Sequence, residues 1–147
     1  MQKQNSLVET APDGIVDDPG FDGRHILLEL KGVSSILLQQ KDELESNLVR
    51  VAEESGATVV KSVIHEFNPY GLSGVVVIAE SHIAIHTWPE YRHASVDIFT
   101  CGNADIAKRI AEGILKALDP DSWESETLSR GASFSRLQRA SSELIDH

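Results

Sequence analysis

The sequence has a single cysteine, few basic residues and no long apolar run. One cysteine in 147 residues cannot form an internal disulfide, which fits a reducing compartment. Only 13 lysines and arginines stand against 23 aspartates and glutamates, and the net charge of −10 argues against a nucleic-acid partner. No apolar run approaches the ~20 residues of a membrane span, and residues 1–20 lack the apolar core of a signal peptide. We therefore expect a cytoplasmic protein that binds neither nucleic acid nor membrane.

The acidic balance leaves two interpretations open. A net negative surface keeps many proteins soluble, and it also attracts cationic small molecules over a long range. The length is that of one ordinary domain, which buries roughly 70% of its unfolded surface and needs neither a metal nor a disulfide for stability.

Hydrophobic spacing predicts an α+β fold. Residues 34–54 and 103–118 have apolar positions at helical spacing, with Asn103 as a helix cap and Pro120 ending the second helix. The order of elements predicts a two-layer sandwich, an antiparallel sheet with two helices on one face. Its open edges favour pairing with a second copy. The expected strands are 25–30, 58–67, 74–79, 83–87, 94–101 and 123–128.

This pattern also predicts the domain organisation. Residues 1–22 are polar, contain prolines and glycines, and are expected to form a flexible arm. Residues 23–128 form the domain, and residues 129–147 are expected to be a partly ordered tail. The chain contains no internal repeat.

Three polar residues, Glu80-Ser81-His82, interrupt an apolar strand pattern. A serine with a nearby histidine suggests a nucleophile and its base. The Gly-x-Ser-x-Gly signature of hydrolases is absent around Ser81. Ser81 and His86 are five positions apart and would face opposite sides of an unbroken strand, so they can cooperate only if the chain bends near Ser81. The alternative is an ordinary solvated strand end.

Two further patterns have ordinary explanations beside the functional ones. His82 and His86 are four apart, a spacing that binds zinc on a helix, but the local pattern is that of a strand, where this spacing covers roughly 13 Å. We therefore expect no metal. Cys101 closes an apolar strand and is either a small buried hydrophobe or a thiol that moves a proton.

Several motifs together resemble the prokaryotic S-adenosylmethionine decarboxylases. These are small, self-cleaving enzymes that depend on a pyruvoyl group. Glu80-Ser81-His82, the stretch Ile85-His86-Thr87-Trp88-Pro89-Glu90, and Phe99-Thr100-Cys101-Gly102 carry the similarity at specific spacings. The resemblance covers about residues 23–118 and is densest in 23–25, 54–58, 65–91 and 94–102.

The resemblance implies that the chain cuts itself between Glu80 and Ser81. The Ser81 hydroxyl would attack the Glu80 carbonyl, and elimination with loss of ammonia would leave a pyruvoyl group on the new N-terminus. That group forms a Schiff base with the substrate amine and accepts the electrons released by decarboxylation. The product, decarboxylated S-adenosylmethionine, serves polyamine (spermidine) biosynthesis. The family also implies a homo-oligomer of cleaved protomers, (αβ)2.

The resemblance also implies roles for single residues. Ser73 and His86 would assist processing, His86 as the base, and Cys101 would be the acid that reprotonates the substrate carbon. For the substrate, a small cationic molecule of amino-acid type, the implied contacts are Phe67 and Trp88 beside the adenine and Glu90 at the ribose.

One departure from the family pattern concerns the substrate. Arg92 and His93 stand where many relatives have a glycine and a tyrosine. Related enzymes decarboxylate arginine or ornithine with the same machinery, and some carry a basic residue at this position. Phe67, Trp88 and Glu90 favour the nucleoside substrate. Two other classes remain as alternatives, a non-processing regulatory homologue and a metal-dependent hydrolase.

Overall fold

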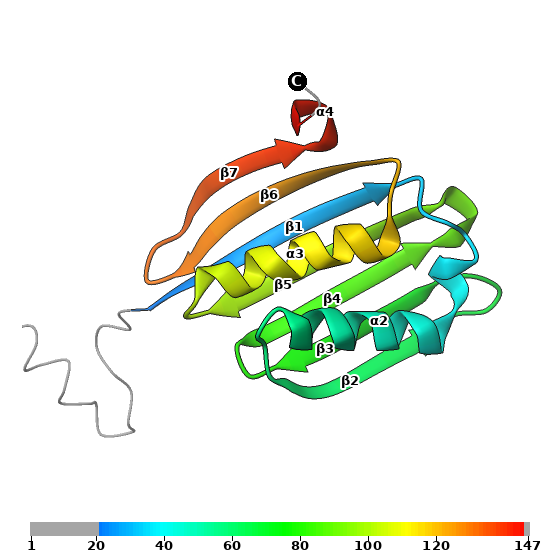
Figure 1. The fold of residues 1–147 in the computed structure, drawn as a ribbon, viewed down its shortest axis with the longest axis horizontal. Coiled ribbons are helices and arrows are strands. Elements are labelled where there is room, and N and C mark those ends of the chain that lie inside the picture. The colour runs from blue at the N-terminus through cyan, green and yellow to red at the C-terminus, as the bar shows by residue number, and fades with distance from the viewer. Residues whose placement is uncertain (1–20, 146–147) are drawn as a thin grey trace, which may run out of the picture.

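A seven-stranded antiparallel sheet forms one layer of the molecule, and two helices form the other (Figure 1). The structure is a computed structural model in which residues 21–145 are described. The strand order across the sheet is β2-β3-β4-β5-β1-β6-β7. The strands are β1 Asp22–Lys31, β2 Val59–Glu66, β3 Leu72–Ile78, β4 Ser81–Trp88, β5 His93–Cys101, β6 Ser122–Gly131 and β7 Ser135–Ser141. The helices are η1 Leu37–Gln39, α2 Lys41–Glu54, η2 Pro89–Tyr91, α3 Ala104–Leu118 and α4 Ser142–Ile145.

The core lies between the sheet and helices α2 and α3. Alternate residues of β5 are buried, because successive side chains of a strand point to opposite faces. α3 turns one apolar stripe to the sheet, and each fully buried aliphatic side chain contributes roughly 1.5–3 kcal/mol. The predicted α+β sandwich with two helices on one face is therefore confirmed. The central side chains of this core include Leu28, Leu44, Leu48, Val96, Ile98, Ile110 and Ile114.

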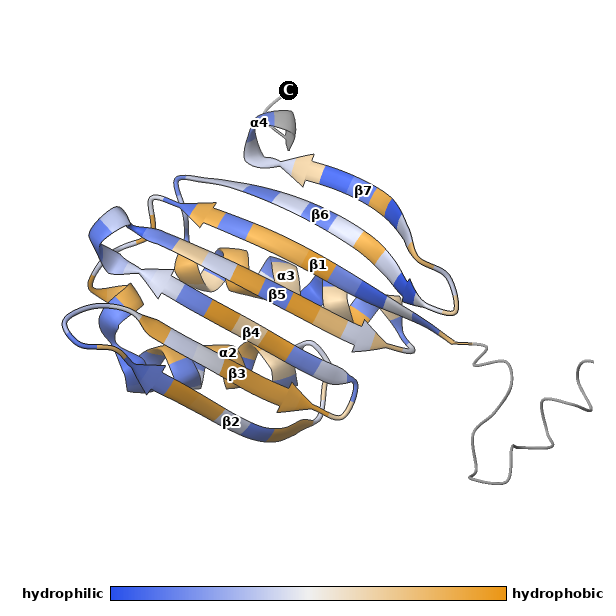
Figure 2. Cartoon of the chain, turned by 180° about the vertical axis from the view of Figure 1, so that it is seen from behind, coloured by the Kyte–Doolittle hydropathy of each residue, from blue (hydrophilic) through white to orange (hydrophobic). Residues whose placement is uncertain are grey.

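Within residues 21–145, no helix covers the opposite face of the sheet, as Figure 2 shows from behind. We call it the open face. The residues on it alternate with the core residues, so its β4 and β5 positions are His82, Ala84, His86 and Trp88, and His93, Ser95, Asp97, Phe99 and Cys101. All the site residues discussed below lie on this face or at its ends.

The helix expected over residues 34–54 is in fact two pieces. A short 3-10 helix, η1, comes first, and α2 starts only after Gln40, whose backbone is not helical. Leu38 is fully buried, and its carbonyl accepts a hydrogen bond from the hydroxyl of Thr87 on β4. A tertiary contact thus takes the carbonyl that a continuous helix would use. The predicted cap of the second helix is confirmed, because the Asn103 side chain accepts from the backbone N–H of Asp105 at the start of α3. Gly56 follows α2 with φ +95°, the position at which a helix end favours glycine.

The chain beyond residue 128 differs from the expected partly ordered tail. β6 continues to Gly131, and β7 pairs with it as an additional edge strand. Most side chains of β7 are exposed, so its sequence has no apolar alternation that would predict a strand. Ion pairs from Arg136 to Glu126 and from Arg139 to Glu124 accompany the pairing.

At the other end of the chain, residues 1–20 of the predicted arm 1–22 lie outside the described residues, and Asp22 opens β1. None of the helices within residues 21–145 has both the length and the hydropathy needed to cross a membrane.

Candidate active site

Ser81 begins β4 in a backbone conformation that L residues rarely adopt. Its φ is +155°, a region almost restricted to glycine that costs roughly 1–3 kcal/mol for other residues. The tight connection between Ile78 and Ser81 produces it, because β3 and β4 pair directly at these two residues. The bend that the sequence pattern required near Ser81 is therefore present.

Glu80, the residue before the bend, is held at two points. Its backbone carbonyl accepts a hydrogen bond of 2.9 Å from the backbone N–H of Cys101. Its carboxylate accepts one of 3.2 Å from the backbone N–H of Thr58. The carbonyl next to Ser81 is thus fixed and polarised by a donor that belongs to the neighbouring strand.

Cys101 lies beside Ser81. Its Sγ is 3.9 Å from Ser81 Oγ, and the side chain is half-buried, not sealed in the core. The sequence left open whether Cys101 is a buried hydrophobe or a thiol that moves a proton. Its contact with Ser81 favours the second interpretation.

His86 and Ser73 form a second group at a distance from Ser81. Ser73 Oγ and His86 Nδ1 are 2.9 Å apart, on directly paired residues of β3 and β4. Ser81 pairs with Thr100 of β5, whereas His86 pairs with Ser95. Five residues of strand therefore separate Ser81 from His86, about 17 Å at the usual rise. The bend at Ser81 therefore does not bring these two side chains together within a single chain.

The three expected substrate contacts lie at the His86 end. Phe67 follows β2, and its ring is 4.6 Å from that of His65. Trp88 closes β4 and is 40% exposed, and its ring is 5.7 Å from that of His93. Glu90 is exposed in η2. A hollow of about 530 Å³ opens beside Trp88, with Lys31, Tyr91, His93 and Ser95 as its other lining residues.

A cluster that the sequence analysis gave no role lies between Ser81 and the middle of the open face. Arg130 of β6 lies over the ring of Phe99, with its guanidinium carbon 4.8 Å from the centroid. Its Nη1 is 3.0 Å from Nδ1 of His25 on β1, and His25 also contacts His82 and Phe99. Desolvation lowers the pKa of His25. The motif Gly23-Arg24-His25 was the available signal, but Arg130 stood in the expected tail.

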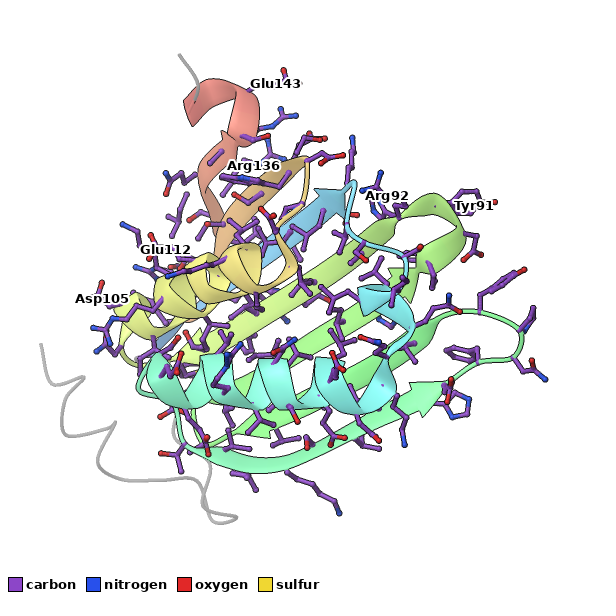
Figure 3. The ribbon with its side chains drawn as sticks, turned by 45° about the vertical axis from the view of Figure 1, so that its right-hand side comes forward. Tyr91, Arg92, Asp105, Glu112, Arg136 and Glu143 are labelled. Atoms are coloured by element: carbon purple, nitrogen blue, oxygen red, sulfur yellow. The ribbon has the colours of Figure 1, made fainter. Side chains whose placement is uncertain are left out.

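Arg92 is not directed at any of these groups. It has φ +54°, the left-handed conformation that a glycine adopts without strain. Its side chain is labelled in Figure 3. Its guanidinium donates to the carbonyls of Gly32 and Val33 and lies 3.9 Å from the carboxylate of Asp121. This conformation is compatible with the glycine that the family resemblance leads one to expect here, and the contacts of Arg92 join two loops. It gives no support to an arginine or ornithine substrate.

The described residues contain no group of three or more histidine, cysteine or acidic side chains arranged to hold a metal ion. His82 and His86 both lie on strand β4, as the local pattern predicted.

Comparisons with known proteins identify the same family as the sequence motifs. The sequence model of the S-adenosylmethionine decarboxylase family matches residues 24–131. A protein named S-adenosylmethionine decarboxylase proenzyme from Archaeoglobus fulgidus is 41% identical over 109 residues, which is 74% of this chain and 97% of that one. The protein of that name from Thermodesulfovibrio yellowstonii is 46% identical over 97 residues, 66% of this chain and 72% of the other.

Solved structures agree in fold. The crystal structure of adenosylmethionine decarboxylase from Aquifex aeolicus has a TM-score of 0.72 and 35% identity, over 76% of this chain and 92% of the other. A Trypanosoma brucei AdoMetDC monomer has a TM-score of 0.55 at 16% identity, over 71% of this chain and 45% of that one, and supports the fold alone.

The fold and these relatives define a class, the decarboxylases that are made as proenzymes. Within that class, the chain belongs to the S-adenosylmethionine decarboxylase family. This is the family that the motifs around Ser81 predicted.

Proposed function

We propose that this chain cleaves itself between Glu80 and Ser81, acquires a pyruvoyl group from Ser81, and decarboxylates S-adenosylmethionine in the cytoplasm. The observation that carries the proposal is that three features meet at the start of β4. A serine in a strained conformation follows a carbonyl that is already hydrogen-bonded, and a thiol lies 3.9 Å from its hydroxyl. The product would enter polyamine synthesis, as the family implies.

Cleavage would begin with attack of Ser81 Oγ on the carbonyl carbon of Glu80. Negative charge then develops on the carbonyl oxygen, which the Cys101 N–H holds at 2.9 Å, within the range of an oxyanion donor. The amide nitrogen leaves and an ester remains. A base removes the α-proton of Ser81, and the Glu80 carboxylate departs. The resulting enamine tautomerises, water adds and ammonia is lost. Strain at Ser81 is released when its amide bond breaks.

His86 is proposed as the base of this reaction, but from a second copy of the chain. Its distance from Ser81 within one protomer, about 17 Å along β4, is too great for proton transfer. Two copies packed through their open faces about a two-fold axis across the strands would bring the His86 end of one against the Ser81 end of the other. The proposed oligomer, (αβ)2, would then carry two composite sites, each with Ser73 and His86 from one copy and Glu80, Ser81 and Cys101 from the other.

In decarboxylation, the residues of this chain bind the substrate and return a proton. The pyruvoyl group would serve as the electron sink for the electrons released with CO2. Trp88 and Phe67 would stack on the adenine, since both rings are partly exposed, and the Glu90 carboxylate would accept from the ribose hydroxyls. The Cys101 thiol would deliver a proton to the substrate carbon after CO2 leaves.

The test is to purify the protein and analyse it on a denaturing gel and in a CO2-release assay. Two fragments that meet at the 80/81 bond are expected, together with release of CO2 from S-adenosylmethionine. Ser81→Ala should remain one full-length chain and release none, while the matched control Ser125→Ala on β6 should behave as the wild type. Cleavage of Ser81→Ala at the same bond would show that a protease makes the cut.

Arginine and ornithine belong in the same assay as alternative substrates. Trp88 and the hollow beside it favour the nucleoside. Cleavage together with CO2 release from arginine or ornithine alone would keep the self-processing mechanism and replace the substrate. An uncleaved wild-type chain without activity would instead fit a regulatory homologue.

A further inference from the structure

The cluster around Phe99 joins side chains from four neighbouring strands. His82 comes from β4, Phe99 and Asp97 from β5, His25 from β1 and Arg130 from β6. The rings of His25 and His82 lie 5.5 and 5.8 Å from that of Phe99. Arg130 covers the same ring from the side of β6. The cluster is therefore a built part of the open face.

The contact between Arg130 and His25 fixes the protonation of the imidazole. A guanidinium is always charged, carries only donors and has no acceptor. At 3.0 Å from Arg130 Nη1, the Nδ1 of His25 must therefore accept. An imidazole that accepts at Nδ1 is neutral, and its one proton is on Nε2.

The Nε2–H that results has no hydrogen-bond partner within the described residues, although the atom is buried. The nearest carboxylate oxygen, Asp97 Oδ1, is 3.7 Å away, which is too long for a hydrogen bond. Buried polar groups in native proteins are nearly always paired. An unpaired, oriented donor next to a reaction site indicates a group that binds there.

The position of His25 defines what that group is. Gly23 pairs with Cys101 and His25 pairs with Phe99, so His25 is the diagonal cross-strand neighbour of Cys101, roughly 7–8 Å away between backbones. His82, the next member of the cluster, directly follows Ser81. A donor here suits an oxygen of the reacting molecule: the carboxylate of the substrate or a carbonyl beside the new N-terminus.

We propose that Arg130 is a positioning residue of this site. By donating to Nδ1, it holds His25 neutral with its Nε2–H available to a carboxylate or carbonyl oxygen next to Cys101. This inference rests on the proposed function for its chemistry. It also explains why the sheet extends past β1, because β6 brings the guanidinium to the site.

Burial and the neighbouring positive groups also favour the neutral form of His25. Burial lowers the pKa of His25 first, Arg130 and His82 lower it further, and the Asp97 carboxylate opposes them. These are the charged or titratable groups that face His25 from β4, β5 and β6. Removing Arg130 should therefore raise the pKa of His25, and removing the charge of Asp97 should lower it.

Two readouts test the role of Arg130. In ¹⁵N-histidine NMR of the purified protein, cleaved or uncleaved, the wild type should have His25 protonated at Nε2 only. Arg130→Met should show a mixture of tautomers or the imidazolium. In activity measurements, Arg130→Met should lower kcat/KM by about tenfold, as expected for one misplaced charge-assisted hydrogen bond. The acid limb of its pH profile should shift to higher pH, and that of Asp97→Asn should shift to lower pH.

Control variants separate positioning from folding. Arg136→Met removes an arginine of the same face from the next strand, β7, and should leave both readouts unchanged. Arg130→Lys keeps a charged donor and should recover part of the Nε2–H signal. A thermal melt of Arg130→Met close to that of the wild type verifies its fold.

The role is refuted if wild-type His25 carries its proton on Nδ1, or if Arg130→Met leaves the tautomer and the acid limb unmoved. The NMR measurement decides the tautomer even if the wild-type protein releases no CO2. Failure of this inference is therefore distinguishable from failure of the proposed function.

Discussion

The two ends of the open face are built differently. At the Ser81 end, the backbone is strained, a carbonyl is pinned by Cys101 N–H, and a thiol lies against the serine. At the His86 end, the strands follow ordinary register, and the polar pair Ser73–His86 and the ring of Trp88 are exposed. Under the proposed function, one end would hold the bond to be broken, and the other would hold the base and the substrate-binding residues.

If the proposed function is right, neither end is a complete active site by itself. The Ser81 end lies five residues along β4 from His86, the base proposed for processing, and the described backbone at the His86 end has no strained peptide like that at Ser81. Both ends lie on the same sheet face, so a two-fold related copy can unite them without any change of fold.

The largest effect should come from mixing two inactive chains. His86→Ala alone and Ser81→Ala alone should both remain uncleaved. In a mixed dimer, one of the two composite sites would combine Ser81 of the first variant with His86 of the second. Coexpression with different tags should therefore restore cleavage, and only of the chain that carries His86→Ala. Absence of cleavage in a verified mixed dimer would mean that a base other than a partner's His86 acts.

Cys101→Ala should separate making the pyruvoyl group from using it. Alanine keeps the backbone N–H that holds the Glu80 carbonyl, so the chain should still process at least in part. Decarboxylation should fall by about 10²–10⁴-fold, the usual contribution of a general acid. Gel analysis measures the first and CO2 release the second. Mass spectrometry of the fragment 81–147 during turnover should also find alanine accumulating at its N-terminus. Normal turnover without that inactivation would assign the proton to another group.

A smaller effect should appear in stability against pH. Because burial lowers the pKa of His25 below its ordinary 6.5, the unfolded chain takes up the proton first as the pH falls. This contribution to stability is fully present above pH 6.5 and is lost as the pH falls from there towards the folded pKa. Thermal melts between pH 7.5 and 5 should show a weaker dependence in His25→Gln than in the wild type. Parallel curves would mean that His25 stays neutral in both states or titrates equally in both.

The smallest effect should be that of Arg92→Gly. Glycine removes the left-handed strain, about 1 kcal/mol, but also the hydrogen bonds to Gly32 and Val33, so urea denaturation should give a stability within about 1 kcal/mol of the wild type. Arg92→Ala keeps the strain and should be the less stable variant. Neither should change the ratio of rates on S-adenosylmethionine and arginine. A changed ratio would mean that Arg92 influences the choice of substrate.

The sequence predicted the fold class because its central elements carry strong periodic signals. β5 alternates strictly, α3 has an asparagine cap and one apolar stripe, and both match the structure closely. β7 was not predicted, since Leu137 is exposed and its neighbours are polar. Its strand conformation depends on pairing with β6, which is information that a local pattern does not contain.

For the site, the sequence predicted candidate residues, whose roles stay predictions, and did not predict how they are arranged. The motif identified Ser81, His86 and Cys101, and strand periodicity required a bend near Ser81, which the φ of that residue provides. Periodicity did not reveal that the bend leaves His86 on the same strand, five residues away. Arg130 was missed because its contact with His25 spans 105 positions of sequence.

The order of the strands has a consequence for the fate of a cleaved chain. A cut after Glu80 assigns β1, β2 and β3 to one fragment and β4 to β7 to the other. In the sheet, however, β1 lies between β5 and β6, so strands of the two fragments are interleaved in one sheet. Separation would require breaking three ladders at once. The cleaved chain can therefore keep its fold. If the two fragments were instead synthesised separately, β1 would have to insert between β5 and β6 of the other fragment for the sheet to form.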